Sequence, residues 1–304
     1  MRKMLSKIKP YLRWLILGVT LFFVAYAFKK NWQAIATVRL TSKSFFILII
    51  ALIVTLFAHL WSGWVWTWIL KEFKQNVYIK WALKIYLITN LAKYFPGNIG
   101  HFYGRIAAVH QAGSTIESAS ISVLLEPLLM ATAALFIAIV SSSFGLIEIN
   151  NLGLQLLILI AILCLIHPRV LNIALQKLSK SKGKQLNLPA IQLKQYLWLP
   201  LLGEIIFVLL RGCGFLLTWL ALMKINTEQI LPLLSSFSFA WLMGLVVPGA
   251  PGGMGIFEAT AIALLNHQHF PAGILLTTVA LFRVISILAE LLGAGLGLLL
   301  NQEK

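Results

Sequence analysis

The stretch that decides the fold is KYFPGNIGHFYGR, residues 93–105, because it interrupts a very apolar chain with polar and helix-breaking residues. A second stretch, VPGAPGGMGIFEA at 247–259, has the same character. The two align without gaps when PGNIGHF at 96–102 is set against PGGMGIF at 251–257, with four identities in seven positions and an offset of 155 (251 minus 96). Pro bends or ends a helix and Gly permits turns that other residues resist. Each stretch therefore predicts a break between two helix segments.

The rest of the chain has the composition of a membrane protein. Of its 304 residues 60% are hydrophobic and only 11% are charged, and the mean hydropathy is +0.88. A soluble domain carries about 25% charged residues. Several apolar runs exceed about 18 residues, which is enough for a helix to cross the hydrocarbon core of a bilayer. The sequence predicts an all-α polytopic membrane protein that forms a single integral membrane domain over residues 1–304.

Six full spans are predicted, together with two broken segments that either re-enter the membrane from one side or form pairs of spans. We expect six to eight spans in total. The full spans lie near 14–28, 44–70, 119–144, 152–167, 197–223 and 271–299. The broken segments are 81–112 and 229–266, and a basic loop is predicted at 168–195.

The net charge of +16 comes from Lys and Arg that cluster in short loops. Cytoplasmic loops of membrane proteins have this excess of Lys and Arg. Anionic lipid head groups, and not nucleic acid, are therefore the expected partner of the positive charge. The basic N-terminus and the basic 168–195 loop predict a multi-pass protein of the cytoplasmic (inner) cell membrane, with the N- and C-termini and this loop in the cytoplasm.

The 155-residue offset relates more than the two breaks. Shifted by 155, the span at 44–70 falls on 199–225 and the span at 119–144 falls on 274–299, and both targets are apolar. Internal repeats are therefore predicted at 44–144 and 199–299, each with a span, a broken segment and a span. The first repeat starts outside and the second inside, which is the inverted arrangement of many secondary transporters. The alternative is that two Pro-Gly turns agree by chance.

The two breaks are also the candidate site, because the free N–H groups at the start of a half-helix attract anions. Charged residues lie close by, and charge at membrane depth usually faces a partner or a polar cavity. Glu126 maps to within two positions of Arg283, so Arg–Glu pairing between the repeats is expected. A purely structural ion pair, or a re-entrant turn without a ligand, is the alternative. The candidate substrate-binding residues are Pro96, Gly97, Asn98, Gly100, Arg105, Glu126, Pro251, Gly252, Gly253, Gly255, Glu258 and Arg283.

Three further charged residues are candidates for the same cavity. Glu204 and Arg211 are seven positions apart, so they share one helix face, and Glu290 lies in the last span.

Residue types that carry enzyme chemistry are scarce. All nine acidic residues are Glu, whereas Mg²⁺-dependent sugar or phosphoryl transfer usually holds its metal with Asp. The sequence contains no P-loop and no GxSxG motif. No catalytic residue, metal site or cofactor is predicted, and the protein is not expected to be an enzyme. An intramembrane enzyme that uses Glu126 or Glu258 as an acid or base is the third alternative.

PGNIG with Arg105, AGSTIESASISVLLE at 112–126, PGAPGGMGIFEA at 248–259 and Arg283 together resemble the lysylphosphatidylglycerol synthase transmembrane family. That family includes the flippase regions of aminoacyl-phosphatidylglycerol synthases and stand-alone membrane proteins linked to lipid glycosylation. Where the family usually has Glu followed directly by Arg, the present chain has Glu126 followed by Pro127.

The resemblance implies a lipid translocator for a phosphate-bearing lipid, such as aminoacyl-phosphatidylglycerol or a polyprenyl-phosphate sugar. The alternative is a non-catalytic membrane scaffold for a separate lipid synthase or glycosyltransferase. The full-length synthases carry a soluble aminoacyltransferase domain after the membrane part. The present chain has no room for it after 271–299, so transfer of lysine to lipid is not expected of this polypeptide.

Overall fold

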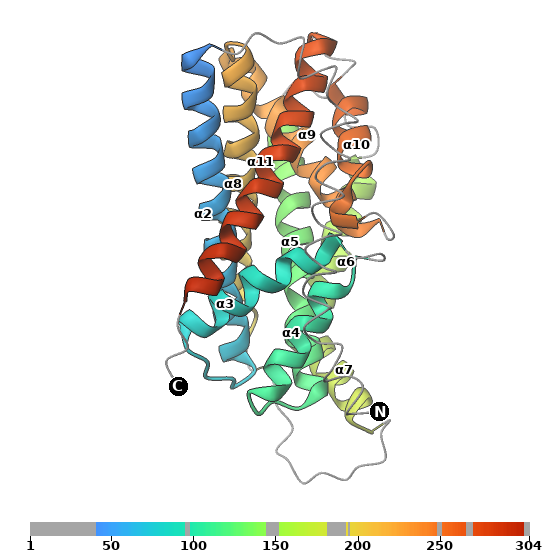
Figure 1. Cartoon of the computed structure of the whole chain (residues 1–304). Coiled ribbons are helices and arrows are strands. Elements are labelled where there is room, and N and C mark those ends of the chain that lie inside the picture. Colours follow the sequence, from blue (N-terminus) through green and yellow to red (C-terminus); the bar gives the residue numbers. More distant parts are fainter. Residues whose placement is uncertain are drawn as a thin grey trace.

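The computed structural model describes residues 41–94, 98–143, 152–180, 193, 195–247, 251–265 and 270–300. In these residues the secondary structure is helical, and Figure 1 shows a bundle of long helices with shorter helices beside and below it. The α-helices are α2 (Ser42–Glu72), α3 (Ile79–Asn90), α4 (Gly100–Gln111), α5 (Ile116–Ser143), α6 (Leu152–Leu165), α7 (Pro168–Lys180), α8 (Trp198–Leu222), α9 (Thr227–Val246), α10 (Ile256–Leu265) and α11 (Ala272–Leu299). Two short 3₁₀-helices are η1 (Leu91–Tyr94) and η2 (Pro251–Gly253).

Five of the described helices are long and apolar enough to cross a membrane, namely α2, α5, α8, α9 and α11. The all-α polytopic class is therefore confirmed. The spans predicted near 44–70, 119–144, 197–223 and 271–299 correspond to α2, α5, α8 and α11. The span predicted near 14–28 lies outside the described residues.

Two predicted segments have a different form. Helix α6 has 14 described residues, so at 1.5 Å per residue it is about 21 Å long, which is less than a hydrocarbon core of about 30 Å. The shorter span predicted near 152–167 contains this helix, and residues 144–151 before it lie outside the described residues. The broken segment at 229–266 contains one full-length candidate span, α9, followed by the short α10, whereas 81–112 contains the two short helices α3 and α4.

The basic loop predicted at 168–195 begins with a helix, because residues 168–180 form α7, and its cytoplasmic position stays a prediction. Pro168 occupies the first helical position, where its missing N–H costs nothing. The helix is held in place by Asn172, whose side chain accepts a hydrogen bond from the backbone N–H of Leu193 at 2.9 Å and donates one to its carbonyl at 3.0 Å. The chain between 181 and 192 lies outside the described residues.

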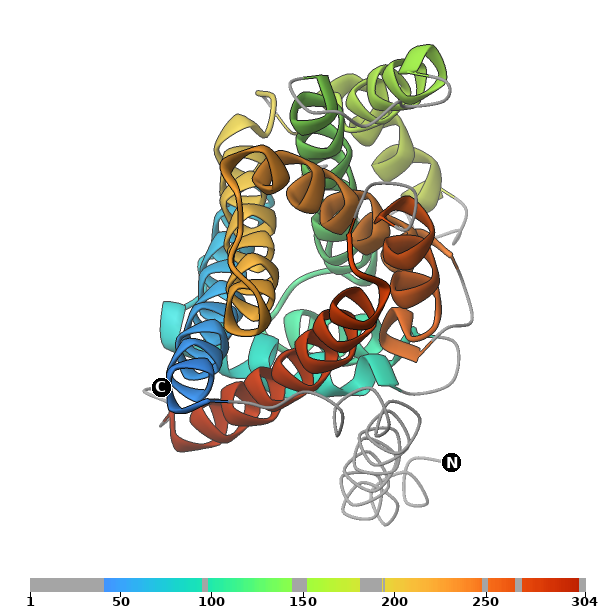
Figure 2. The same ribbon diagram turned by 90° about the horizontal axis from the view of Figure 1, so that it is seen from above.

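Helices α2 and α8 pack side by side in opposite directions (Figure 1). In the second half of α2, the Trp61 indole N–H donates to the Gly203 carbonyl, close to the start of α8, at 2.8 Å. Nearer the start of α2, a Cβ on Gly214 would lie 2.5 Å from the Thr55 hydroxyl, so glycine permits this close contact. Seen from above, α8, α9, α10 and α11 then follow one another around the molecule (Figure 2).

The order of elements in the first half returns in the second half. The first half consists of α2, α3, η1, α4 and α5, and the second of α8, α9, η2, α10 and α11. The packing corresponds too, since α3 packs on α11 while α9 packs on α5. Asn98 and Gly253, which the 155-residue offset aligns, both have left-handed backbones, with φ of 56° and 71°. Together with the antiparallel α2 and α8, these observations favour the inverted repeat, which stays a prediction.

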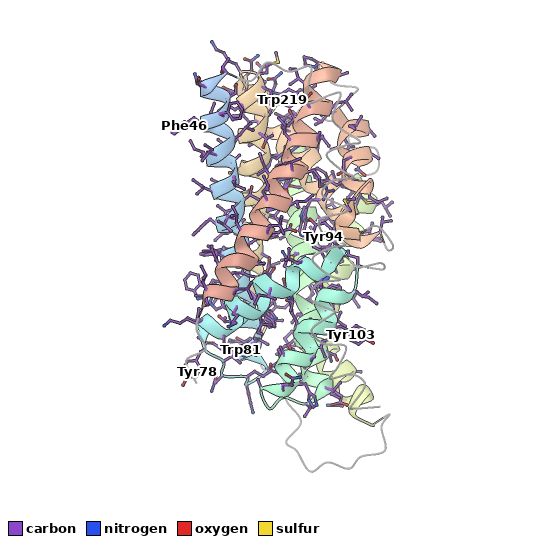
Figure 3. All side chains as sticks on the ribbon, in the orientation of Figure 1. Phe46, Tyr78, Trp81, Tyr94, Tyr103 and Trp219 are labelled. Carbon is purple, nitrogen blue, oxygen red and sulfur yellow. The ribbon has the colours of Figure 1, made fainter. Side chains whose placement is uncertain are left out.

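The outer surface of α2 is apolar, as expected of a helix that faces lipid. Phe46 is 65% exposed and points away from the bundle (Figure 3), and Phe45, Ile49, Ile53 and Phe57 are also more than half exposed. The interior contains a cluster of four packed aromatic rings from α8, α9, α10 and α11, namely Phe215, Phe237, Phe257 and Phe282. This cluster lies next to the site described below, because Phe257 and Phe282 also line its cavity.

Candidate functional site

A cavity of about 110 Å³ lies where the two breaks meet, and both halves line it. Its volume suits a small polar group or a few water molecules. The polar and charged lining residues of the first half are His59, Tyr86, Asn90, Lys93, Asn98, His101, Arg105 and Glu126. Those of the second half are Arg211, Arg283, Ser286 and Glu290.

The first break is shaped by residues that tolerate unusual backbone or close contact. Asn98 has φ of 56°, a left-handed conformation that Asn adopts more readily than most residues. Helix α4 begins two residues later at Gly100. A Cβ on Gly100 would lie 2.5 Å from the Ala92 carbonyl oxygen in η1, so only glycine fits against that backbone. The predicted helix break is therefore present here, with α4 starting close to η1.

The Arg105–Glu126 ion pair links α4 to α5. The Arg105 Nη1 donates to Glu126 Oε2 at 2.5 Å, and the two side chains are only 2% and 3% exposed. The Tyr86 hydroxyl donates to the other Glu126 oxygen at 2.7 Å, and the Arg105 guanidinium lies 3.8 Å from the centre of the Tyr86 ring. Arg105 Nε also donates to the Thr89 hydroxyl at 3.2 Å. Glu126 therefore has a cationic partner although Pro127 follows it in the sequence.

The second break is held by Arg283 of α11. Its Nε donates to Glu258 Oε1 at 2.6 Å, and Nη1 and Nη2 donate to the carbonyls of Gly252 and Gly253 at 3.1 and 3.3 Å. Both glycines, and Gly255 after them, have left-handed backbones. The Gly255 N–H donates to Glu258 Oε2 at 2.6 Å, which satisfies a free N–H at the start of α10. Arg283 therefore joins α11, α10 and the break itself.

The expected Arg–Glu pairing between the two repeats is wrong. Arg105 pairs with Glu126 in the first half, and Arg283 pairs with Glu258 in the second. The reason is that each pair joins two helices that follow each other in the chain and pack together, α4 with α5 and α10 with α11. This geometry fits the alternative expectation, in which each arginine and glutamate form a structural ion pair.

A different ion pair crosses between the halves. Lys93 of η1 lies 2.6 Å from Glu290 Oε1 of α11. The Tyr94 hydroxyl donates to Glu290 Oε2 at 2.9 Å, and His59 Nε2 lies 3.6 Å from Oε1. Figure 3 labels Tyr94 at the centre of the bundle, between the short helices and α11. Glu290 therefore joins the first break to the last long helix.

Arg211 is the cavity cation that has no carboxylate partner among the described residues. Its side chain is buried, its Nη2 donates to the Ser286 hydroxyl at 3.1 Å, and its guanidinium lies 5.1 Å from the centre of the Phe282 ring. Its Nε and Nη1 make no hydrogen bond within the described part of the chain. Polar atoms of three other lining residues are likewise without a hydrogen-bond partner there, namely Asn98 Oδ1, His59 Nε2 and His101 Nδ1.

Six of the predicted substrate-binding residues line the cavity, namely Asn98, Arg105, Glu126, Gly252, Gly253 and Arg283. Gly100, Gly255 and Glu258 belong to the breaks but are not part of the lining. Pro251 begins η2, and Pro96 and Gly97 lie outside the described residues. The role of all twelve predicted residues in substrate binding stays a prediction. Of the further candidates, Arg211 and Glu290 line the cavity and Glu204 does not.

Sequence reasoning missed other lining residues. Lys93 and His101 lie within the polar stretch at 93–105, so their position there was a usable signal. His59 is the one ionisable residue in the apolar segment 44–70, and Tyr86 and Ser286 carry no signal of their own. Within the described ranges, three or more His, Cys or Glu side chains do not come together as metal ligands.

Comparison with known proteins agrees with the resemblance that the motifs carry. A search of curated proteins gave no match. A family model described as the lysylphosphatidylglycerol synthase TM region matches residues 13–293, which is nearly the whole chain and includes both breaks. The chain therefore belongs to the family of the lysylphosphatidylglycerol synthase transmembrane region, whose members are membrane proteins related to lipid metabolism.

Proposed function

We propose that the protein is a non-enzymatic translocator that moves a lipid with a phosphate-bearing head group across the cytoplasmic membrane. The observation that carries this proposal is Arg211, a buried cation that lines the cavity with two N–H-bearing nitrogens unpaired among the described residues. An unpaired charge in an apolar interior costs several kcal/mol. An anion that enters the cavity would remove this cost.

The charge balance of the site favours an anionic ligand. Among the described cavity residues, the cations Lys93, Arg105 and Arg283 each contact a carboxylate, from Glu290, Glu126 and Glu258 respectively. This pairing leaves the positive charge of Arg211 uncompensated. A guanidinium offers a planar fork of donors that matches a phosphate, and such charged hydrogen bonds are about twice as strong as neutral ones.

The position of the cavity supports transport. It lies between two halves that repeat the same order of helices, and sites at a repeat interface are typical of secondary transporters. Movement of one half against the other would expose the cavity to each side of the membrane in turn. Aminoacyl-phosphatidylglycerol and a polyprenyl-phosphate sugar both carry the phosphate that this proposal requires. The proposal also includes both termini on the cytoplasmic side.

The test is a vesicle assay with the purified full chain. Fluorescent phosphatidylglycerol and fluorescent lysyl-phosphatidylglycerol are placed in both leaflets, and a membrane-impermeant reductant then destroys the label that reaches the outside. Wild-type vesicles should lose nearly all fluorescence, whereas protein-free vesicles should retain about half. Arg211→Gln should abolish the additional loss. The matched control is Arg169→Gln, which changes an exposed arginine on α7 and should behave as the wild type.

Two outcomes would contradict the proposal. If folded Arg211→Gln protein moves lipid at the wild-type rate, Arg211 does not bind the head group. If wild-type protein moves no labelled lipid, the scaffold role replaces translocation. The scaffold role predicts instead that a separate synthase or glycosyltransferase co-purifies with the chain.

A further inference from the structure

Glu204 is a carboxyl group buried inside the bundle with no hydrogen-bond partner in the described part of the chain. Its residue is 0% exposed, and neither Oε1 nor Oε2 accepts a hydrogen bond from a described residue. It lies on α8, one of the helices long enough to cross the membrane. The residue before it, Gly203, is covered by α2, because its carbonyl accepts the Trp61 indole N–H and its Cα faces Val65. The described part of the fold thus encloses Glu204 without supplying a hydrogen-bond donor.

Glu204 lies on the helix face that leads to the cavity. Phe207 and Arg211 follow it by three and seven positions, so the three side chains share one face of α8, and the latter two line the cavity. Two helical turns separate Glu204 from Arg211, which corresponds to about 10 Å along the axis. The two unpaired groups therefore do not neutralise each other by contact.

The groups that act on Glu204 come from three other helices. Glu126 of α5 repels its carboxylate form, Arg105 of α4 attracts it, and Tyr86 of α3 is close enough to interact with it. On α2, His59 contacts the ring of Phe207, one turn along α8 from Glu204. On α9, Trp241 contacts the same ring.

Helix α11 also packs on α8. Its two charged cavity residues are already in ion pairs, and they lie closer to Arg211 than to Glu204 along α8. Arg283 and Glu290 are bound to Glu258 and Lys93, at the level of Arg211 and Ser286. The charged groups that act on Glu204 are therefore Arg105 and Glu126, which form an ion pair with each other.

Arg105 acts electrostatically on two carboxyl groups in this cluster, but it is bonded only to Glu126. Glu126 already takes Arg105 and the Tyr86 hydroxyl. An ionised Glu204 would be a second negative charge near Glu126, buried and without a donor among the described residues, at a cost of several kcal/mol. A carboxylic acid with a bound proton avoids that cost. Ionisable groups within membrane helices typically belong to ion or proton pathways.

We propose that Glu204 binds a proton, and that exchange of this proton is coupled to movement of the ligand in the cavity. Coupling, but not proton binding, rests on the proposed function. The step is uptake of one proton by the carboxylate to give the neutral acid. When the proton leaves, the Glu204 carboxylate competes with Glu126 for Arg105. Because Arg105 holds α4 against α5, this competition alters the wall of the cavity next to the first break.

Proton binding is tested by infrared spectroscopy of the full chain in lipid. The wild type should show a carbonyl stretching band of a carboxylic acid at neutral pH, which shifts in D₂O. Glu204→Gln should remove that band. The matched control is Glu228→Gln, an exposed carboxylate at the start of α9, which should leave the band unchanged. If Glu204→Gln fails to fold, Glu204→Asp should retain the band at a changed frequency.

Coupling is tested by imposing a pH difference on the same vesicles used for lipid movement. A difference of one pH unit corresponds to a factor of about 10 for each coupled proton. The distribution of labelled lipid between the leaflets should shift by up to this factor in the wild type and in Glu228→Gln. In Glu204→Gln the distribution should not respond.

The outcomes separate the two proposals. If the wild type has no carboxylic-acid band that depends on residue 204, the proton site is refuted, whatever the lipid does. If lipid moves in the wild type but ignores the pH difference, coupling is refuted. If the band is present and no vesicle moves lipid, the translocator proposal fails while the proton site is supported.

Discussion

Replacement of Gly253 by alanine tests the close contact that forms the second break. Gly253 has φ of 71°, and a Cβ there would lie 2.8 Å from the carbonyl oxygen of Gly244 on α9 and 3.0 Å from its Cα. Backbone atoms cannot move aside as the end of a flexible side chain can. Gly255 is the matched control, because its φ of 86° is also left-handed but a Cβ there would meet nothing within 4 Å. Both variants therefore place an alanine in a left-handed backbone conformation, but only Gly253→Ala also places its Cβ against the backbone of Gly244.

The magnitudes follow from these two costs. A residue other than glycine in the left-handed region costs about 1–2 kcal/mol. Forcing an atom into a well-packed place costs about 1–3 kcal/mol more. Gly255→Ala should therefore destabilise the protein by about 1–2 kcal/mol, and Gly253→Ala by about 2–5 kcal/mol.

Thermal unfolding of the purified protein in detergent, followed by tryptophan fluorescence, is the measurement. Gly253→Ala should have the lower melting temperature by several degrees. Equal melting temperatures for the two variants would refute the close approach of η2 to α9. A Gly253→Ala variant as stable as the wild type would also refute the left-handed backbone at that position.

The remaining predictions use the same melting assay. Glu126→Gln should cost about 3–5 kcal/mol, because it leaves Arg105 buried without its carboxylate. The double variant Arg105→Met with Glu126→Leu should recover much of that loss, and no recovery would show that the pair is not the source of the loss. Lys93→Met should cost less than Glu126→Gln, because the side chain of Lys93 is 20% exposed and that of Glu126 is 3% exposed; a larger loss would contradict this order. Tyr86→Phe should cost about 1–3 kcal/mol, because it removes the hydroxyl that contacts both Ser62 and Glu126, and an unchanged melting temperature would count against those bonds.

The breaks could be predicted from the sequence because their cause is local. Pro and Gly act on the backbone at their own positions, so PGNIG and PGGMG indicate interrupted helices without knowledge of their neighbours. The alignment of the two stretches even placed Asn98 opposite Gly253, and both adopt the left-handed conformation. Long apolar runs predicted α2, α5, α8 and α11 for the same reason, since the length needed to cross a bilayer is fixed.

The pairing of charges could not be predicted, because it depends on how each helix is rotated against its neighbours. The offset placed Glu126 near the position equivalent to Arg283, but a position in the repeat does not fix which partner a side chain faces. Glu290 illustrates this, because its contacts come from Lys93 and Tyr94, almost 200 positions earlier in the chain. Likewise, nothing in the sequence around Arg211 indicates that its guanidinium lacks a carboxylate partner among the described residues.

Helix α7 shows a different limit of sequence reasoning. The segment is predicted as a basic loop because it carries several Lys and Arg residues. The same charges fit an amphipathic helix, in which apolar residues such as Val170 and Ile173 lie among them. Both residues are about half exposed, as expected where such a helix rests on a membrane surface.

The three ion pairs at the cavity have different consequences for motion. Arg105–Glu126 and Arg283–Glu258 each lie within one half, so they can persist while the halves move against each other. Lys93–Glu290 joins the halves, and any such movement must break or exchange it. Under the proposed function, a phosphate held by Arg211 offers Lys93 a second anionic partner in the same cavity. Ligand binding would then weaken the ion pair that holds the two halves together.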